Sequence, residues 1–527
     1  MRDFHSPGRS TVYAVNGMAA TSMPQATLTA IEVLKSGGNA LDAAVAAAAV
    51  LAVIEPQSTG IGGDCFCLYA PAGSREVVAM NGSGRSAAGF TLDALAGLGV
   101  HRLDETSPHV VTIPGAVAAW EKLLAAHGRQ GLDTLLQPAI RYAEDGFVVH
   151  PRVALDWQGN ARKLAATGAD DYLPGGKAPA AGDIVRLPKL ARTLRSIATQ
   201  GARAFYEGEI AVSIVAALKA RGGLHTEADF AAGYLAPEFV TAITKGFAGH
   251  DIWECPPNGS GLVALMIMGI MNGVAPCADP LDPLRLHRHI EAARLAYRDR
   301  DAFLADPAHM LQSVEHLLSD AYLSGLRALI DNEKAIENLP PAGELHRDTV
   351  YLSVVDRDGN ACSFINSLFE SFGSGIVGGD TGVLLHNRGL GFRMEPDHPS
   401  RVGPNKRPLH TIIPAMATHG GEPSIVFGVM GGHFQPMGQS WVLSNLLQYG
   451  LDPQAAIDLP RLFPYGGWVE VEKGIPATAR DLLAIKGHRI HASVRPHGGG
   501  QMIVIDRLRG VLMGASDPRK DGCALGY

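Results

Sequence analysis

The chain of 527 residues carries 45 Lys and Arg against 52 Asp and Glu, a formal net charge of −7, and 46% of its residues are hydrophobic. These values describe a folded, mildly acidic chain that is long enough to bury a large core. Lys and Arg are nowhere concentrated as a nucleic-acid-binding face requires, so we expect no nucleic acid partner.

The cysteines and the apolar segments exclude further classes. Six scattered cysteines form neither a disulfide framework nor the Cys-x-x-Cys spacing of a zinc site. The first ten residues are charged and contain Pro7, where a secretory signal would need an apolar run. The most apolar stretch, 40–54, is too short to span a membrane. We therefore expect a cytoplasmic protein without membrane contact.

Helical patterns dominate the chain up to about residue 330. A helix is predicted over 24–36, and a second begins after Asn39 as its N-cap and ends before Pro56. Residues 65–70 and 75–80 have the composition of two strands that flank a turn. The clearest later helices are predicted over 116–127, 132–145, 189–200 and 284–304.

The pattern changes at Thr349. Residues 349–356 alternate like a strand, Arg357-Asp358-Gly359 has turn composition, and 360–369 is typical of a returning strand. Upstream, 331–347 is polar, contains Pro340-Pro341 and is predicted to be an exposed loop.

The turn fixes the pairing of this hairpin. If Gly359 adopts the left-handed conformation of a three-residue loop, Asp356 pairs with Asn360 and Thr349 lies opposite Ser367. Their side chains would share one face of the sheet, so the Ser367 hydroxyl could hydrogen-bond the Thr349 hydroxyl.

Thr349 itself has two interpretations. As a β-branched residue it simply favours a strand. Alternatively, cleavage of the preceding peptide bond would free an α-amino group that serves as the base for its own hydroxyl, which makes it an N-terminal nucleophile.

Motifs along the whole chain favour the second interpretation. In order, they are Gly37-Gly-Asn-Ala-Leu-Asp-Ala-Ala44, Ile61-Gly-Gly63, Pro114-Gly115, Glu291-Ala-Ala-Arg-Leu-Ala-Tyr-Arg-Asp-Arg300, Thr349 to Asn360, Phe372-Gly-Ser-Gly-Ile-Val-Gly-Gly379, Pro404-Asn-Lys-Arg-Pro-Leu409 and Gly514-Ala-Ser-Asp-Pro-Arg519. This series, from about Gly17 to Tyr527, resembles the γ-glutamyltransferase family of N-terminal-nucleophile hydrolases.

The resemblance implies a fold and a chemistry. It implies a four-layer αββα sandwich, made as a proenzyme that cleaves itself between Asp348 and Thr349. Residues 1–348 would form a helix-rich large subunit and 349–527 a strand-rich small subunit, a heterodimer that could assemble further. Thr349 would attack an amide carbonyl, and water or an acceptor amine would release the acyl group. Gly431 and Gly432 align with the family's oxyanion glycines, and no metal or cofactor is implied.

This sequence departs from the family at the residues that recognise the substrate. The usual Ser-Ser pair is His410-Thr411, the Asn is Phe369, the Gln is Arg388, the Asp is Gly391, and the family's Arg has a counterpart only in Arg85, displaced by about two residues. An arginine at 388 would repel an α-amino group and attract a carboxylate, unless it pairs with a surface acid. Asp64 could line the pocket or cap a turn.

Three functions remain open from the sequence. The first is cleavage of γ-glutamyl-type amides, with hydrolysis favoured over transfer because the segment between Phe392 and Gly403 is short. The second is hydrolysis of a small carboxylate-bearing amide without an α-amino group, which resembles the oxamate amidohydrolase branch. The third is an unprocessed, inactive relative that acts as a binding protein.

Overall fold

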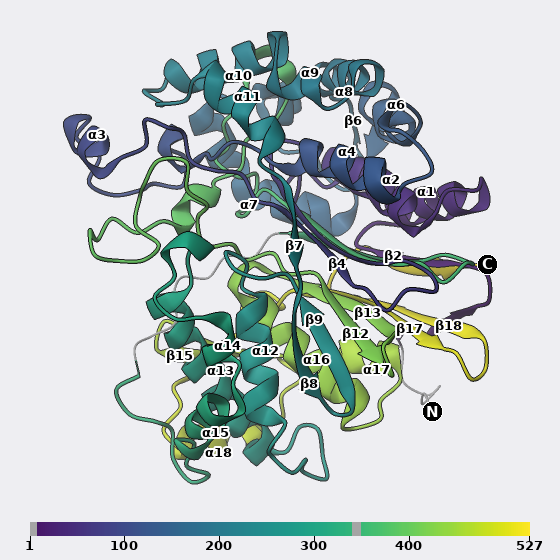
Figure 1. Cartoon of the computed structure of the whole chain (residues 1–527), viewed down its shortest axis with the longest axis vertical. Coiled ribbons are helices and arrows are strands. Elements are labelled where there is room, and N and C mark those ends of the chain that lie inside the picture. The colour runs from purple at the N-terminus through teal and green to yellow at the C-terminus, as the bar shows by residue number, and fades with distance from the viewer. Residues whose placement is uncertain (1–7, 340–348) are drawn as a thin grey trace.

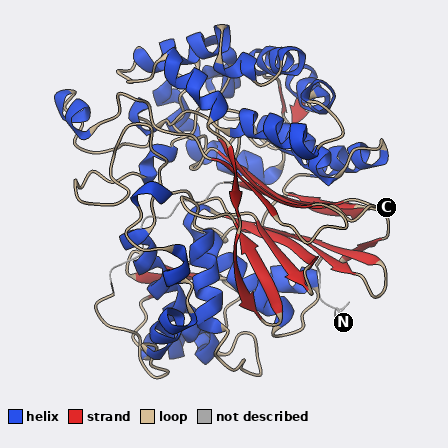
Figure 2. Ribbon diagram, in the orientation of Figure 1, coloured by secondary structure: helices blue, strands red, loops and turns tan. Residues whose placement is uncertain are grey.

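The computed structural model describes residues 8–339 and 349–527, and it has four layers (Figures 1 and 2). Two antiparallel sheets face each other in the middle, and helices cover the outer face of each. The αββα architecture predicted from the sequence is therefore confirmed. In the described ranges, no helix is both long enough and apolar enough to cross a membrane.

Each large sheet combines strands from before and after Thr349. The first, in spatial order, contains β19 (Cys523–Gly526), β2 (Met18–Thr21), β10 (Val350–Val355), β11 (Ala361–Ser367), β3 (Asp64–Ala70), β4 (Val78–Gly82) and β7 (Glu238–Thr241). The second contains β1 (Val12–Ala14), β18 (Val511–Ser516), β17 (Gly499–Asp506), β13 (Glu422–Met430), β12 (Ala415–His419), β9 (His250–Glu254) and β8 (Ile243–Phe247). Small sheets join β5 (Phe147–Val148) to β6 (Ile184–Val185), and β14 (Leu462–Tyr465) and β16 (Ile490–Ala492) to β15 (Trp468–Val471).

The helices form two groups. The upper group in Figure 1 contains α1 (Pro24–Lys35), α2 (Ala40–Ile54), α3 (Leu92–Gly97), α4 (Ala116–His127), α5 (Leu132–Leu135), α6 (Gln137–Asp145), α7 (Pro151–Thr167), α8 (Pro188–Gln200), α9 (Arg203–Tyr206), α10 (Glu209–Lys219) and α11 (Glu227–Leu235). The lower group contains α12 (Gly261–Met271), α13 (Pro283–Phe303), α14 (Val314–Leu317), α15 (Asp320–Ala328), α16 (Gln435–Leu447), α17 (Pro453–Asp458) and α18 (Ala477–Ile485).

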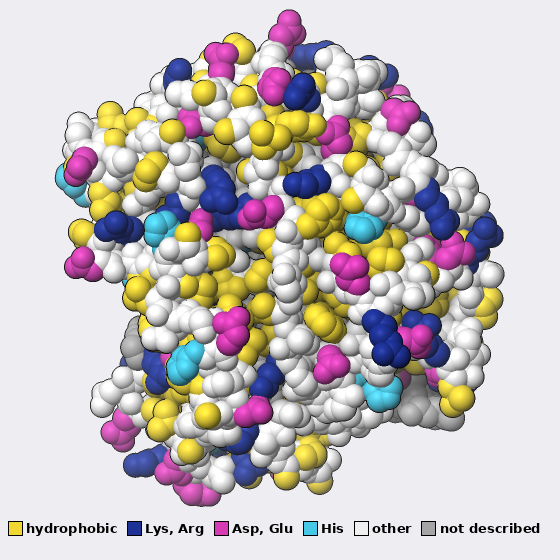
Figure 3. Space-filling model, viewed as in Figure 1, with side chains coloured by type: hydrophobic (Ala, Val, Ile, Leu, Met, Phe, Trp, Pro, Cys, Tyr) yellow, Lys and Arg dark blue, Asp and Glu magenta, His cyan; other side chains and the backbone are white. Residues whose placement is uncertain are grey.

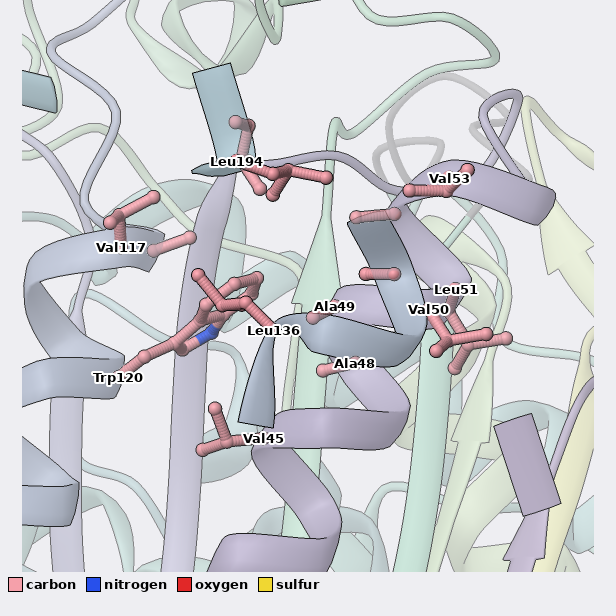
Figure 4. Packing of buried hydrophobic residues seen from close by; sticks show 14 of the residues in the cluster. Val45, Ala48, Ala49, Val50, Leu51, Val53, Val117, Trp120, Leu136 and Leu194 are labelled. Carbon is pink, nitrogen blue, oxygen red and sulfur yellow. The ribbon is translucent and has the colours of Figure 1, made fainter. Parts of the chain in front are cut away.

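Helix α2 forms the centre of the upper core. Asn39 caps it as predicted, because its side chain accepts from the Leu41 and Asp42 amides while the Asp42 carboxylate accepts from the Asn39 amide. All fifteen residues of α2 are buried, and its small Ala side chains allow α1, α6 and strand β10 to pack closely. Trp120 and Leu136 fill the space beside it (Figure 4).

The predicted hairpin is confirmed in type and register. Gly359 has a φ of +93°, its amide donates to the Asp356 carbonyl, and the Asp356 amide donates to the Asn360 carbonyl. Val350 pairs with Asn366, which sets Thr349 opposite Ser367. Odd-numbered positions of β10, such as Tyr351, belong to the core between the two sheets, so the Thr349 side chain points into that layer.

Several predicted boundaries need correction. The strand predicted over 75–80 is β4, Val78–Gly82, and the helix over 132–145 is two helices broken at Leu136, before Pro138. Strands β7 to β9 lie in a region that we expected to be helical, because their short, half-exposed pattern gives little period-2 signal. Residues 331–339 form no helix or strand, as predicted, and 340–348, with Asp348 of the expected cleavage bond, lie outside the described residues.

Candidate active site

Thr349 and Ser367 are neighbours at the ends of two central strands. Both are fully buried, and their hydroxyl oxygens are 3.1 Å apart. The Ser367 oxygen also accepts a hydrogen bond of 2.8 Å from the Phe369 amide. Phe369 has a φ of +79°, a conformation that L-residues rarely adopt, so this bond helps to hold a turn that carries Phe369 over the end of the strand.

Gly431 and Gly432 form the turn that follows β13. Their φ values of +126° and +56° favour glycine. The turn's own backbone bonds run from the Phe434 amide to the Gly431 carbonyl and from the Gln435 amide to the Gly432 carbonyl. Neither glycine amide donates within the turn, so both suit a role as oxyanion donors.

Arg388 is a buried residue and not a surface one. Its Nη1 donates to the Thr411 hydroxyl at 2.8 Å, and its guanidinium carbon lies 4.2 Å from the centre of the Phe369 ring. Among the described residues, its Nε and Nη2 have no hydrogen-bond partner. Burial lowers the pKa of Arg388 to about 9, which leaves it a cation at neutral pH. A buried guanidinium with two unused donors is suited to bind an anion.

His410 belongs to a buried polar group behind Arg388. Its Nε2 donates to the Asp64 carboxylate at 2.9 Å, and its Nδ1 accepts from the Ile412 amide, so the ring is the neutral tautomer. Burial, followed by the charge of Arg388, lowers the pKa of His410 to about 3.

Asp64 connects several loops and does not line the pocket. Its other oxygen accepts from the Gly84 and Gly115 amides, at 3.0 and 3.1 Å. Burial alone would raise the pKa of Asp64, but His386, His410 and Arg388 outweigh it and hold this pKa well below its usual range. Asp64 therefore supplies the negative charge opposite Arg388 and fixes the His410 ring.

A cavity of about 570 Å³ opens beside this group. Its wall includes the predicted specificity positions Phe369 and Gly391, together with Glu370, Arg300 and His433. The His433 ring lies 6.2 Å from the Phe369 ring, and Arg300 Nη1 is 2.9 Å from His433 Nδ1. Since His433 directly follows the glycine turn, the cavity borders both the turn and the segment that carries Ser367.

Arg85 lies apart from this cavity. Its Nη1 contacts the Asp306 carboxylate at 3.4 Å and the Asn405 carbonyl at 3.1 Å. Neither Arg85 nor the buried Arg388 lines the cavity itself, but Arg388 lies directly behind the lining residue Phe369. The structure thus places Thr349 beside Ser367 and Arg388 beside Thr411, and Phe369 contacts both Ser367 and Arg388. His410 binds Asp64, while Arg85 pairs with an acid elsewhere.

Most residues of the cavity wall were not predicted, and among them are the polar residues Arg300, Glu370 and His433. Arg300 is the last residue of the motif that begins at Glu291, and His433 directly follows Gly432. Their positions in or next to a family motif were the sequence signal that could have identified them. Glu370 had none. Its carboxylate accepts from Asn387 Nδ2 at 2.6 Å, and its hydrogen bond with Glu105, after burial, raises the pKa of Glu105.

Comparisons with known proteins agree with this geometry. A family model described as gamma-glutamyltranspeptidase matches residues 26–527. The glutathione hydrolase-like YwrD proenzyme of Bacillus subtilis is 36% identical over 505 residues, 94% of this chain and 95% of that protein. The oxamate amidohydrolase proenzyme of Klebsiella pneumoniae is 33% identical over 546 residues, 99% of this chain and 100% of that protein.

A solved structure extends the likeness to the fold. The cephalosporin acylase from Bacillus halodurans superposes with a TM-score of 0.93 and 39% identity, over 100% of this chain and 99% of that one. Sequence, fold and relatives agree: the chain belongs to the γ-glutamyltranspeptidase family and is an enzyme of the N-terminal-nucleophile hydrolase class.

Proposed function

We propose that this chain is a self-processing amidohydrolase with Thr349 as its nucleophile. Cleavage of the bond between Asp348 and Thr349 would free the Thr349 α-amino group, which takes the hydroxyl proton as the oxygen attacks an amide carbonyl. The amine departs with a proton, and water then hydrolyses the threonyl ester. The proximity of Ser367 to Thr349 and the description of the curated relatives as proenzymes support this proposal.

The proposed substrate class rests on one observation, the buried guanidinium of Arg388. A carboxylate on the acyl part of the substrate would satisfy its two unused donors in a bidentate pair. Position 391 is a glycine and offers no acid for an α-amino group. No larger residue fits there, because a Cβ would lie 2.4 Å from the Leu409 carbonyl oxygen. The preferred substrate is therefore an amide of a dicarboxylate without an α-amino group, a class that includes oxamate, named in one relative's description.

Hydrolysis of γ-glutamyl amides is the second candidate. Glu370 on the cavity wall is a carboxylate that could receive an ammonium group, and other relatives are described as glutathione hydrolases. In the structure, however, this carboxylate already binds Asn387 and Glu105.

Three anilides that differ by one group each would separate these functions. Butyryl-p-nitroanilide lacks the carboxylate, glutaryl-p-nitroanilide has it, and γ-glutamyl-p-nitroanilide adds the α-amino group. We expect kcat/KM to be highest for the glutaryl compound, and oxamate should be tested beside it by ammonia release. A higher kcat/KM for the γ-glutamyl compound would favour the second candidate. Equal kcat/KM values for the butyryl and glutaryl compounds would show that Arg388 does not recognise the substrate carboxylate.

Two further measurements complete the test. Addition of glycylglycine should leave the rate of p-nitroaniline release within about twofold, because we propose that water is the main acceptor. Denaturing electrophoresis should show pieces of 348 and 179 residues (527 minus 348). A single full-length band that persists, without activity on any amide, would instead support the inactive binding protein.

A further inference from the structure

The motif Gly514-Ala-Ser-Asp-Pro-Arg519 has no role in the site described so far. Its charged members, Asp517 and Arg519, lie in a buried group with Arg461 and Glu472, which we call the clamp. Arg461 and Asp517 are fully buried, and their side chains meet at 2.6 Å. Arg519 donates to both oxygens of Glu472, at 2.9 and 2.6 Å. Two cations and two anions thus balance inside the protein.

The clamp forms hydrogen bonds with one short stretch of backbone, residues 497–500. Arg461 Nη1 donates to the His497 carbonyl at 2.6 Å, and Glu472 accepts from the His497 amide at 2.9 Å. Asp517 accepts from the Gly500 amide at 2.7 Å, and its own amide donates to the Gly500 carbonyl. Both ends of the stretch are therefore held by charge-assisted hydrogen bonds, which are stronger than neutral ones.

This stretch lies directly against the glycine turn of the active site. A Cβ on Gly431 would be 2.9 Å from the Gly498 Cα, and a Cβ on Gly498 would be 2.5 Å from the Met430 carbonyl oxygen. The rings of His497 and Phe434 stack with their centres 5.3 Å apart. The two backbones touch without room for a side chain, so a displacement of 497–500 would displace Gly431.

We propose that Arg461, Glu472, Asp517 and Arg519 are positioning residues that hold residues 497–500 against the turn and so fix the direction of the Gly431 and Gly432 amides. This inference rests on the proposed function, in which these amides bind the oxyanion. The clamp touches no substrate. Its effect is on the transition state, because donors must aim at the place where charge develops.

Asp517→Asn tests the proposal, since it keeps the shape of the side chain and removes the charge that holds Arg461. Loss of one oxyanion donor typically costs a factor of about 10² to 10³ in kcat, so misdirected donors should cost about 10- to 100-fold, with KM within about threefold. Asp229→Asn is the matched control, because Asp229 is also a buried carboxylate that accepts from two backbone amides, those of Ala88 and Thr226. Rates are taken per processed molecule, with the best of the three anilides.

A boronate inhibitor supplies a readout that loss of stability alone would not move. 4-Boronobutyrate imitates the tetrahedral intermediate of glutaryl transfer when the Thr349 oxygen bonds to boron and releases its proton, whereas glutarate imitates the product. We expect Asp517→Asn to weaken the boronate by the same factor as kcat/KM and to leave the Ki of glutarate unchanged. Should that variant fail to fold, Arg461→Lys, which keeps the charge but loses the forked geometry, decides by the same measurements.

The outcomes keep the two proposals apart. If the wild-type enzyme hydrolyses an anilide and Asp517→Asn has a kcat within twofold of the wild-type value, the positioning role of the clamp is wrong and the proposed function stands. Equal losses in Asp517→Asn and Asp229→Asn at equal melting temperatures would lead to the same conclusion, because they would reflect stability only. Retention of hydrolysis by Thr349→Ala would overturn the proposed function instead.

Discussion

Replacement of Ser367 by alanine tests whether the hydrogen bond between the Ser367 and Thr349 hydroxyls contributes to catalysis. The variant removes the contacts of the Ser367 oxygen with the Thr349 hydroxyl at 3.1 Å and with the Phe369 amide at 2.8 Å. A buried amide that loses its acceptor costs about 1–3 kcal/mol of folding free energy. A hydrogen bond to the reacting hydroxyl that strengthens in the transition state is worth about 1.4 kcal/mol, so we expect kcat/KM to fall about tenfold.

Ser363→Ala is the matched control for this variant. Ser363 lies on the same strand and on the same face, is equally buried, and binds the Tyr351 hydroxyl at 2.8 Å. Tyr351 keeps a second partner in Ser353, so the control should lose about 1 kcal/mol of stability and no activity. Ser367→Thr, which retains a hydroxyl, should recover part of the rate.

The assay is release of p-nitroaniline by processed enzyme, with urea unfolding to measure stability. The decisive quantity is the ratio of kcat/KM between Ser367→Ala and Ser363→Ala. If this ratio is within twofold of one, after correction for the folded fraction, Ser367 has no part in tuning the nucleophile and the reasoning fails.

Three further predictions concern processing, recognition and pH. Thr349→Ala should remain a single band on denaturing gels and Thr349→Ser should cleave slowly; cleavage of the alanine variant at the same bond would contradict the nucleophile assignment. Arg388→Gln should cost about 2–5 kcal/mol in kcat/KM for glutaryl-p-nitroanilide and little for the butyryl compound, whereas a loss below about 0.5 kcal/mol for both would leave Arg388 without a role in binding. Both carboxylate oxygens of Glu254 lack a partner among the described residues, and burial raises its pKa well above the usual value. The folded state therefore keeps a proton that the unfolded state loses above about pH 4.5, so unfolding free energy should fall by about 1.4 kcal/mol per pH unit from there until the folded pKa. Glu254→Gln should flatten this slope in urea titrations at pH 5 to 7, and an unchanged slope would show that Glu254 ionises freely.

Local sequence patterns determined the elements whose signals are contained in a few residues. Asn39 and Asp42 define a capping box, and Arg357-Asp358-Gly359 defines a turn whose loop length sets the register of its hairpin. The opposition of Thr349 and Ser367 follows from that register alone, because side chains on a strand alternate between its two faces. The family and the layered fold followed from motifs spread along the chain.

Only the tertiary structure decided how Arg388 and Arg85 differ. Both are arginines in glycine-containing segments, yet Arg388 is fully buried against Phe369 and Thr411, whereas Arg85 reaches Asp306. The exclusion of any side chain at Gly391 depends on the distant Leu409 carbonyl, and the role proposed for Asp517 depends on Gly498 and Gly431. Burial, and contact between residues far apart in the chain, arise from the packing of layers, so no local pattern could reveal them.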